Sequence, residues 1–528
     1  MGIPSYFKHI LDRYKHLLKP TSTDTKASVL LVDFNCLIYG CVRAPTMPLY
    51  THETQIEWET ALLKHIREYV LEIWTTSGKP GIVYLAVDGV VPMAKIRQQR
   101  LRRFKSAWMS KQEIAYGVRN GLVWDTNCIT PGTAFMEKLS VELQSLCSKD
   151  GWIFSGAEHE GEGEQKLMEW IRQQPVEWFN DKSIFVYGLD ADLIVLSMLH
   201  AGTGASAAAQ WSILREKQEF GKLGAASNSK FLLLNISKLV NLFFPDATQR
   251  EYKLYDYVAG MCLLGNDFVP HSLSVHLRDH GHDRLEQVLK EIHMEGLTLL
   301  VKEDGKYRWN KKALEKILIN WSKTESDDIA TGFKQKYKMR SPAPRNDTEF
   351  KLAPLQNLPI EWEDENRLWD KQNLLDGWRE EYYREGASLV SSTDIKVRCA
   401  EYCKGLQWII DYYTGQRTPS QEWMYPWTYP PLWSDILKYV QEQPVLPFPP
   451  VQIGERLQPQ EQLSLVLPIE SWGLIRNESL RTLPQKVPAF WPEKFQFISL
   501  GKRWMWECPP RIPIMTIERL RAALFRVR

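Results

Sequence analysis

Three apolar runs that end in aspartate decide the fold of this chain: V-L-L-V-D at Val29–Asp33, I-V-Y-L-A-V-D at residues 82–88 and I-F-V-Y-G-L-D-A-D at residues 184–192. Such short and almost wholly apolar runs are typical of strands buried on both faces of a parallel sheet. Amphipathic stretches lie between them, and the pattern of residues 58–74 predicts a helix. Alternating strands and helices predict an α/β fold whose strands deliver carboxylates to one rim of the sheet, where ligands of such sheets bind.

Two further acidic motifs add to these carboxylates. G-E-G-E contains Glu162 and Glu164, and L-L-G-N-D-F-V-P contains Asp267. The seven candidates are Asp33, Asp88, Glu162, Glu164, Asp190, Asp192 and Asp267. A single aspartate in such a place is more often a helix cap or a turn residue. Seven like charges in apolar or glycine-rich settings, however, cannot share a site unless cations neutralise them, so we expect a metal site.

The ligand types indicate which metal chemistry to expect. Oxygen ligands alone favour Mg²⁺ or Mn²⁺ over zinc. Two such ions about 4 Å apart can hydrolyse a phosphodiester, because they bind the attacking water and the leaving oxygen. The glycines beside Glu162 would let the backbone turn tightly and bring both glutamates inward. Asp190 and Asp192, two residues apart at the end of a strand, are expected to face the same side.

A basic run follows Asp88, with the sequence K-I-R-Q-Q-R-L-R-R-F-K at residues 95–105. Helical spacing places four of its side chains on one face: Lys95, Gln99, Arg102 and Arg103. A lysine, an amide and two arginines that converge in this way form a compact receptor for a terminal phosphate. The alternatives are a nuclear-localisation signal and a solvated basic face. The position just after Asp88 favours the phosphate receptor.

The composition is that of a globular protein with more than one domain. The chain has 528 residues and a net charge of +2, so its overall charge says little about partners. Its start lacks an apolar signal-peptide core, and no apolar run of about 18 residues follows. We therefore expect an intracellular protein without a membrane partner, cytoplasmic rather than nuclear. Its eight cysteines form no C-x-x-C pair, which argues against zinc sites and disulfides.

These motifs together resemble the Xrn family of 5′→3′ exoribonucleases. The opening M-G-I-P-S-Y-F is similar to that of the family, and further motifs follow in the family's order: V-D-F-N, V-D-G-V-V-P-M-A-K-I-R-Q-Q-R-L-R-R-F, N-C-I-T-P-G-T-A-F-M, G-E-G-E-Q-K, Y-G-L-D-A-D-L-I and L-L-G-N-D-F-V-P-H. The resemblance covers nearly all of residues 1–325 and returns, more weakly, from residue 375 or so to the end. The motifs are long, so the resemblance is specific.

The resemblance implies a fold and a division into domains. It implies an α/β core with a parallel sheet, related to flap and PIN-like nucleases, and a second conserved domain that is mostly helical. Residues 1–330 would form the active-site domain, residues 331–370 a variable linker that includes S-P-A-P-R-N-D-T, and residues 371–528 a helical region that braces the site. Because the chain ends soon after this second region, we expect a compact member without a long C-terminal extension.

The resemblance also implies a function. We expect a processive, monomeric enzyme that uses two Mg²⁺ or Mn²⁺ ions to degrade single-stranded RNA with a 5′-monophosphate to nucleoside 5′-monophosphates. By carry-over from the family, the seven carboxylates bind the metal. Lys95, Gln99, Arg102 and Arg103 bind the 5′-phosphate, and Lys95 also serves catalysis. Two alternatives stay open: a DNA-directed flap or 5′ nuclease, and a catalytically inert RNA-binding protein of the same fold.

Members of this family stack the first bases of their substrate between two aromatic side chains. The first position, six residues after Asp33, holds a histidine in the family and Tyr39 here. In the second region Gln421 replaces one of two tryptophans and leaves Trp423, which is our candidate for the second stacking residue. Ordinary core packing is the alternative for Trp423. The N-terminal segment, residues 2–7, is expected to help close the back of the site.

Overall fold

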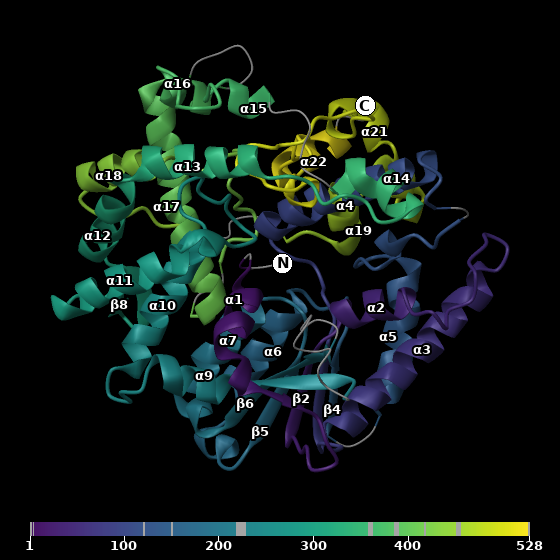
Figure 1. Cartoon of the computed structure of the whole chain (residues 1–528). Helices are drawn as coiled ribbons and strands as arrows, with labels where there is room; N and C mark the ends of the chain where they lie inside the picture. Colours follow the sequence, from purple (N-terminus) through teal and green to yellow (C-terminus); the bar gives the residue numbers. More distant parts are fainter. Residues whose placement is uncertain are drawn as a thin grey trace.

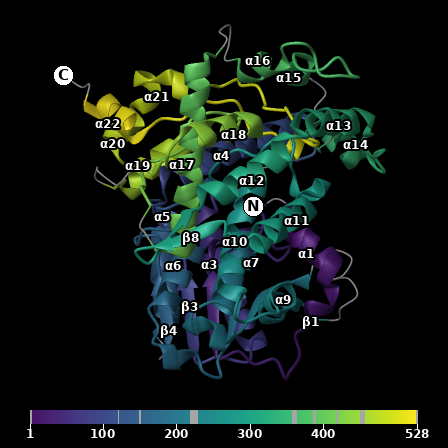
Figure 2. The ribbon, with the colours of Figure 1, turned by 90° about the vertical axis from the view of Figure 1, so that its left-hand side faces the viewer.

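The computed structural model describes residues 3, 5–119, 122–148, 151–217, 229–356, 363–384, 390–416, 419–449 and 456–525. In these residues a seven-stranded sheet occupies the first half of the chain, and helices dominate the second half (Figure 1). Figure 2 shows both parts from the side, with the sheet below the helices of the C-terminal region. The α/β fold with a mostly parallel sheet, expected from the sequence, is confirmed.

The central sheet has the strand order β1-β7-β6-β5-β2-β3-β4. Its strands are β1 (Leu18–Pro20), β2 (Val29–Asp33), β3 (Ile82–Ala86), β4 (Trp152–Ser155), β5 (Ser183–Tyr187), β6 (Gln210–Glu216) and β7 (Phe231–Asn235). The strands from β6 to β4 run parallel, whereas β7 and β1 add antiparallel pairs at one edge. The chain builds the sheet outward from β2 to β4 and then returns to β5 on the other side of β2. The strand order therefore reverses between β2 and β5, and ligands of doubly wound sheets bind at such a switch point.

Helices cover both faces of this sheet. The helices of this part of the chain are α1 (Tyr6–Tyr14), α2 (Asn35–Val42), α3 (Gln55–Thr76), α4 (Met93–Ala115), α5 (Ala134–Leu146), α6 (Gly163–Arg172), α7 (Asp192–Gly202) and α9 (Ile236–Phe243). Helix α4 is the exception among them, because its Ile96 and Phe104 lie in a core with the C-terminal region. Leu30 and Val32 of β2 lie in a core with α2, α3 and α5, whereas Val29 and Leu31 lie in a core with α6, α7 and α9. Successive side chains of a strand point to opposite faces, so an apolar run such as β2 requires helices on both sides.

The rest of the chain is mostly helical. Its helices are α10 (Arg250–Leu264), α11 (Gly281–Met294), α12 (Lys311–Ser322), α13 (Glu325–Lys338), α14 (Asp347–Gln356), α15 (Glu363–Asn366), α16 (Trp378–Tyr383), α17 (Ser392–Thr414), α18 (Trp433–Glu442), α19 (Pro459–Val466), α20 (Glu478–Arg481), α21 (Leu483–Lys486) and α22 (Ile517–Phe525). A hairpin of β8 (Leu300–Glu303) and β9 (Lys306–Trp309) precedes α12. Among the described helices, none is long and apolar enough to cross a membrane.

The segment expected to be a linker, residues 331–370, contains helices. The end of α13, all of α14 and all of α15 lie within it. Lys336 forms a buried ion pair with Glu365, and the Phe333 ring packs against Trp369 with centroids 5.9 Å apart. The described part of this segment is therefore packed against the helical region. The polar, proline-bearing sequence did not reveal this, because its few apolar anchors are far apart.

Helix α4 joins the two halves of the molecule. Arg100 on this helix is 2% exposed. Its guanidinium donates hydrogen bonds to three backbone carbonyls of the C-terminal region, those of Leu465 at 2.8 Å, Pro513 at 3.1 Å and Phe490. It also lies over the Phe104 ring, 4.4 Å from the ring centroid. One charged side chain thus fixes the C-terminal region against α4.

We expect Arg100→Ala to lower the free energy of unfolding by about 2–4 kcal/mol, because three buried carbonyl groups lose their donor. Chemical denaturation followed by tryptophan fluorescence measures the change. Ser106→Ala is the matched control, since Ser106 is exposed on the same helix, and it should change stability by less than about 0.5 kcal/mol. Equal stability of the two variants would contradict the role given to Arg100.

Candidate active site

A small cavity of about 140 Å³ lies at the carboxyl ends of the parallel strands. Its wall is formed by Asp33, Asn35, Cys36, Tyr39, Asp88, Lys95, Gln99, Arg102, Arg103, Ile129, Pro131, Glu162, Glu164, Asp190 and Asp267. Six of the seven predicted carboxylates are among them, and so are all four residues predicted to bind a phosphate. Side chains from segments far apart in the sequence therefore meet in one place.

Neighbouring strands deliver the first two aspartates. Asp33 is the last residue of β2, and Asp88 follows the end of β3 by two residues. Asp88 accepts hydrogen bonds from the side-chain amide of Asn35 at 2.9 Å and from the backbone N–H of Gly163 at 2.7 Å. The strands are parallel, with Asp33 in register with Ala86. The prediction that they bring their aspartates to one rim of the sheet is confirmed.

Glycine shapes the segment that carries the two glutamates. Gly161 has a φ of 98°, a backbone conformation that glycine adopts without strain. A Cβ on Gly163 would lie 2.7 Å from Oδ1 of Asp33, so a side chain there would collide with the site. Helix α6 begins at Gly163, and both Glu162 and Glu164 line the cavity. The tight turn predicted from G-E-G-E is confirmed.

Contrary to the prediction from the sequence, Asp190 and Asp192 do not lie at the end of a strand, and a common direction of their side chains stays a prediction. β5 ends at Tyr187, so both aspartates lie beyond the strand, where its two-residue alternation no longer applies. Asp190 lines the cavity, whereas Asp192 begins α7 and is 2% exposed. Asp192 accepts hydrogen bonds from the backbone N–H of Ile3 at 2.9 Å and from the Tyr413 hydroxyl at 2.8 Å. It thus lies behind the cavity wall, and its role as a metal ligand stays a prediction.

The ammonium group of Lys95 lies between two carboxylates of the cavity. Its Nζ is 2.5 Å from Oε2 of Glu162 and 2.9 Å from Oδ2 of Asp267. Burial alone would lower the pKa of Lys95, but the charges of Asp267 and Glu162 outweigh burial and raise this pKa well above its ordinary value. Lys95 therefore stays charged and neutralises part of the acidic cluster.

The remaining negative charge of the cluster fits a divalent cation. Burial, together with the charges of neighbouring carboxylates, raises the pKa of Asp33 and of Glu164 well above their ordinary range. Oε2 of Glu164 is buried and has no hydrogen-bond partner. Clustered carboxylate oxygens of this kind are the donors that Mg²⁺ and Mn²⁺ prefer. The predicted metal chemistry thus agrees with the residues present, while the identity and number of ions stay predictions.

The residues predicted to bind a phosphate share one wall of the cavity. Lys95, Gln99 and Arg103 are buried there, and Arg102 is exposed at its edge. The helical spacing that predicted a common face is therefore confirmed. Nε of Arg103 is buried and has no hydrogen-bond partner, so this guanidinium keeps a free donor for an anion. Phosphate binding itself stays a prediction.

The two residues predicted to stack bases have different surroundings. Tyr39 on α2 is partly exposed and lines the cavity. Trp423 is 5% exposed, packs on Trp408 with ring centroids 5.6 Å apart, and donates its indole N–H to Glu401 at 3.1 Å. No open face of Trp423 is left for a base in this conformation. The structure therefore gives no support to stacking by Trp423 and agrees better with core packing, whereas stacking by Tyr39 stays a prediction.

Four polar side chains that hold the site together were not singled out from the sequence: Asn35, Asn127, Tyr412 and Tyr413. The Tyr412 hydroxyl donates to Oε1 of Glu162 at 2.5 Å. Asn127 accepts a hydrogen bond from Arg103 at 3.0 Å and donates one to Ser471 at 2.8 Å. These contacts join residues far apart in the sequence. The signal in the sequence is that Asn35 and Asn127 lie inside the long motifs, and that Tyr412 and Tyr413 lie in G-L-Q-W-I-I-D-Y-Y-T-G of the second region, which also resembles the family.

The N-terminal segment also reaches the site. Ile3 is buried, and its backbone N–H is the one that donates to Asp192 behind the cavity. This contact agrees with the expectation that residues 2–7 help to close the back of the site. Gly2 and Pro4, which belong to the same expectation, lie outside the described residues.

We expect Glu164→Gln to be at least as stable as the unmodified chain in EDTA at a pH of about 8, because the change removes a buried charge that lacks a partner. Mn²⁺ should raise the unfolding temperature of the unmodified chain more than that of the variant, because the variant lacks one of the carboxylates expected to bind the ion. Scanning calorimetry with and without Mn²⁺ measures both effects.

Glu169→Gln is the matched control for this substitution, since Glu169 is exposed on the same helix and should not affect either quantity. Suppose that Glu164→Gln is less stable than the unmodified chain in EDTA and that Mn²⁺ raises the unfolding temperature of both by the same amount. The inference that the cavity carboxylates bind a divalent cation would then be contradicted.

Two family models match this chain. The model described as "XRN 5'-3' exonuclease N-terminus" matches residues 1–217, and the model described as "Xrn1 helical domain" matches residues 322–528. The first match contains β1 to β6 of the sheet and all the cavity carboxylates except Asp267, and it also contains Asp192. The second contains the expected linker and the helices that hold Tyr412 and Tyr413.

Curated relatives are similar over almost the whole chain. The 5'-3' exoribonuclease 1 of Saccharomyces cerevisiae is 26% identical over 99% of this chain and 43% of its own length. The 5'-3' exoribonuclease 1 of Homo sapiens is 27% identical over 99% of this chain and 34% of its own length. The 5'-3' exoribonuclease 2 of Debaryomyces hansenii is 25% identical over 99% of this chain and 70% of its own length. The chain thus spans less than half the length of the first two relatives. The α/β half and the helical half each match a domain of the same family, and this chain belongs to the Xrn family of 5′→3′ exonucleases.

Proposed function

We propose that this chain is a processive 5′→3′ exoribonuclease that degrades RNA with a 5′-monophosphate to nucleoside 5′-monophosphates. One observation carries the proposal: a single cavity of about 140 Å³ combines six carboxylates with Gln99, Arg102 and Arg103. The oxygen donors suit hard cations, and the amide and arginines suit a terminal phosphate. Hydrolysis of the RNA therefore takes place next to its 5′ end. The similarity to relatives named 5'-3' exoribonucleases supports the same function.

In the proposed reaction, water attacks the phosphorus of the first phosphodiester and the 3′-oxygen leaves. Divalent cations held by the cavity carboxylates, two Mg²⁺ or Mn²⁺ ions in our proposal, supply an activated water and stabilise the charge on the leaving oxygen. The protein keeps the carboxylates in place: Asn35 and the Gly163 N–H fix Asp88, and Tyr412 fixes Glu162. Lys95 offsets part of their charge and so reduces the repulsion of the substrate's phosphates.

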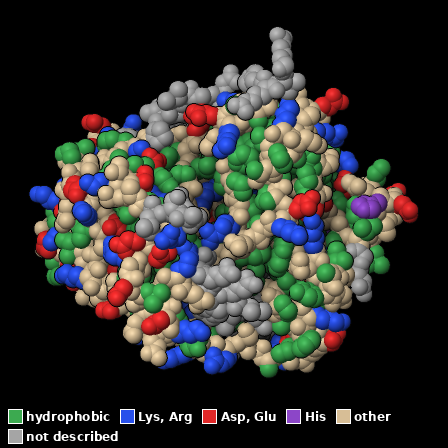
Figure 3. Space-filling view, turned by 90° about the horizontal axis from the view of Figure 1, so that it is seen from above, with side chains coloured by type: hydrophobic (Ala, Val, Ile, Leu, Met, Phe, Trp, Pro, Cys, Tyr) green, Lys and Arg blue, Asp and Glu red, His purple; other side chains and the backbone are tan. Residues whose placement is uncertain are grey.

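The 5′ end is selected by charge and by space. A 5′-monophosphate binds to Gln99, Arg102 and Arg103, of which Arg103 is held in place by Asn127. Lys95, the fourth residue expected to bind this phosphate, is paired with Glu162 and Asp267, and its contact with the phosphate stays a prediction. A 5′-hydroxyl lacks the charge that these groups bind. The cavity is small, and a cap or a triphosphate has little room in it. Over the face seen in Figure 3, Lys and Arg side chains are mixed with Asp and Glu, so we place recognition in the cavity and not on that surface.

Processive degradation requires the RNA strand to stay bound to the enzyme between cleavages. Tyr39 on the cavity wall offers an aromatic face, and stacking on such a face stabilises a bound base by about 1–3 kcal/mol.

Two other functions remain candidates for this fold, a DNA-directed 5′ nuclease and an inert RNA-binding protein. The presence of all the cavity carboxylates favours an enzyme over the inert protein. The monomeric state and the cytoplasmic location expected from the sequence stay predictions.

The test is a time course with Mg²⁺ on one sequence labelled at its 3′ end, supplied as 5′-monophosphate RNA, 5′-triphosphate RNA, 5′-hydroxyl RNA and 5′-phosphate DNA. We expect only the 5′-monophosphate RNA to disappear, without intermediates. Asp190→Ala should be inactive because it removes a cavity carboxylate. Preferential cleavage of the DNA would favour the flap-nuclease function, and binding of RNA without cleavage would favour the inert protein.

Arg103→Ala should weaken the discrimination between 5′ ends. A hydrogen bond to a charged group contributes about 1.5–3 kcal/mol, so kcat/KM for 5′-monophosphate RNA should fall by about 10- to 100-fold. The value for 5′-hydroxyl RNA should stay nearly constant. Steady-state kinetics on both RNAs measure the ratio, with Lys111→Ala as the control on the same helix. The phosphate receptor is assigned incorrectly if Arg103→Ala leaves this ratio unchanged.

A further inference from the structure

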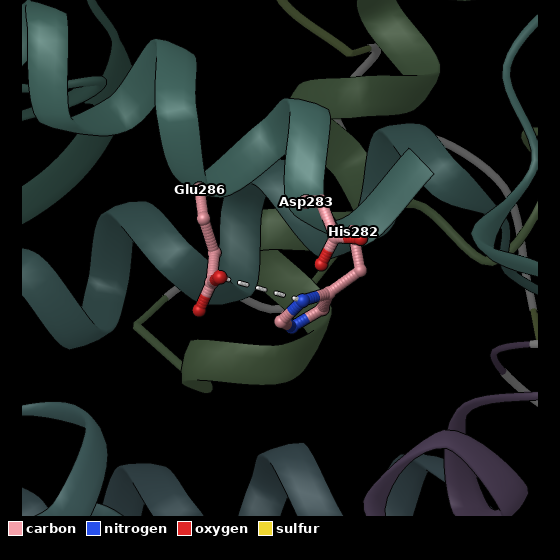
Figure 4. Close-up of side chains that lie close together, drawn as sticks. All are labelled: His282, Asp283 and Glu286. Carbon is pink, nitrogen blue, oxygen red and sulfur yellow. Dashed lines mark ion pairs between the residues drawn. The ribbon is translucent and has the colours of Figure 1, made fainter. Parts of the chain in front are cut away.

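A second group of ligand side chains lies apart from the cavity, where α1 meets α11. His282, Asp283 and Glu286 come from the first two turns of α11, and their ligand atoms all lie within 4.8 Å of one another. In Figure 4 the His282 ring and the Glu286 carboxylate point toward one another. The proposed hydrolysis makes no use of this group.

A chain of hydrogen bonds fixes the protonation of His282, whose ring is fully buried. Its Nε2 is 2.8 Å from the Tyr257 hydroxyl, which is 3.1 Å from the Tyr6 hydroxyl, and Tyr6 donates to the sulfur of Met198. Because a thioether sulfur can only accept, Tyr257 donates to Tyr6 and Nε2 of His282 donates to Tyr257. Each group then uses its one proton, and Nδ1 of His282 is left with a lone pair.

This lone pair faces a carboxylate. Nδ1 of His282 is buried and has no hydrogen-bond partner. Oε2 of Glu286 is 3.8 Å away, beyond hydrogen-bond range. Two acceptors thus face one another, an arrangement that a cation between them would stabilise. Ligand atoms in a tetrahedral Zn²⁺ site lie about 3.4 Å apart, so the gap is close to the required width.

Helix α1 packs against this group and clamps it. The His9 and His282 ring centroids are 4.3 Å apart. Asp283 pairs with Arg13 at 2.8 Å and so holds α11 against α1. The three ligand side chains of α11 therefore lie at a junction that the ion pair already fixes.

We propose that His282, Asp283 and Glu286 form a binding site for a divalent transition-metal ion such as Zn²⁺. An imidazole nitrogen together with carboxylates suits zinc and distinguishes this site from the all-oxygen set in the cavity. Ligating histidines usually donate their second N–H to a neighbouring group, as His282 does to Tyr257.

A bound ion at this site acts on the N-terminus of the chain. It fixes the part of α11 that is paired with α1 through Asp283 and Arg13, and α1 follows Ile3, whose N–H donates to Asp192 behind the cavity. Tyr6 on α1 belongs to the hydrogen-bond chain that ends on His282. The ion therefore stabilises the placement of the N-terminal segment against the back of the cavity and takes no part in hydrolysis.

The test uses Co²⁺ as a spectroscopic substitute for Zn²⁺ on the full chain. We expect one equivalent of Co²⁺ to give the intense visible bands of a four-coordinate ion, and Zn²⁺ to remove them by competition. An all-oxygen six-coordinate ion in the cavity would give only weak bands. Asp283→Asn and Glu286→Gln should each weaken the apparent affinity by at least about tenfold. Both residues are partly exposed, so these variants are expected to fold, and circular dichroism checks this.

Two controls make the outcome decisive. Glu291→Gln, exposed on the same helix, should keep the bands and the affinity of the unmodified chain. Asp190→Ala should also keep them, because the ion does not lie in the cavity. Three outcomes would each overturn the proposal: absence of intense bands, an affinity of the folded Asp283→Asn and Glu286→Gln variants equal to that of the unmodified chain, or loss of the bands in Asp190→Ala.

Discussion

The rest of the site depends on one buried ammonium group, that of Lys95. Carboxylates that gather at the switch point of the sheet repel one another, and burial makes this repulsion stronger because little solvent screens it. Lys95 places a positive charge between Glu162, at the start of α6, and Asp267, beyond the end of α10. It thereby holds together the α/β half and the helical half at the point where their charges meet. Its neutralisation is partial, and this leaves a negative cavity suited to cations.

The helical half gives the site its rigidity. Helix α17 supplies Tyr412 and Tyr413, which donate to Glu162 and Asp192. Further along the chain, Ser471 accepts a hydrogen bond from Asn127, the residue that holds Arg103. Arg100 binds three carbonyls of the C-terminal region from the same helix that carries Arg103. An α/β sheet can bring charged residues to its rim, but contacts of this kind are needed to hold them at fixed distances.

Local patterns were sufficient to predict much of the fold and the site. The apolar runs identified β2, β3 and β5, and the helical spacing of Lys95, Gln99 and Arg103 placed them on one wall of the cavity. These features depend on neighbouring residues in the chain, and so the sequence shows them directly. Asp192 was misplaced because β5 ends at Tyr187, and where a strand ends depends on its neighbours in the sheet. The burial of Trp423 and the packing of residues 331–370 depend in the same way on contacts distant in sequence.

The most direct test of this account is a crystal structure of the Asp190→Ala chain with Mg²⁺ and a short 5′-phosphorylated oligoribonucleotide. The account predicts the 5′-phosphate at about 2.7–3.2 Å from the donors of Gln99, Arg102 and Arg103. It predicts the first phosphodiester beside Asp33 and Glu162, with the rest of the strand leading out of the cavity. A 5′-phosphate bound outside the cavity, or a strand that enters it with its 3′ end, would contradict the claim that one cavity both recognises the 5′ end and cuts next to it.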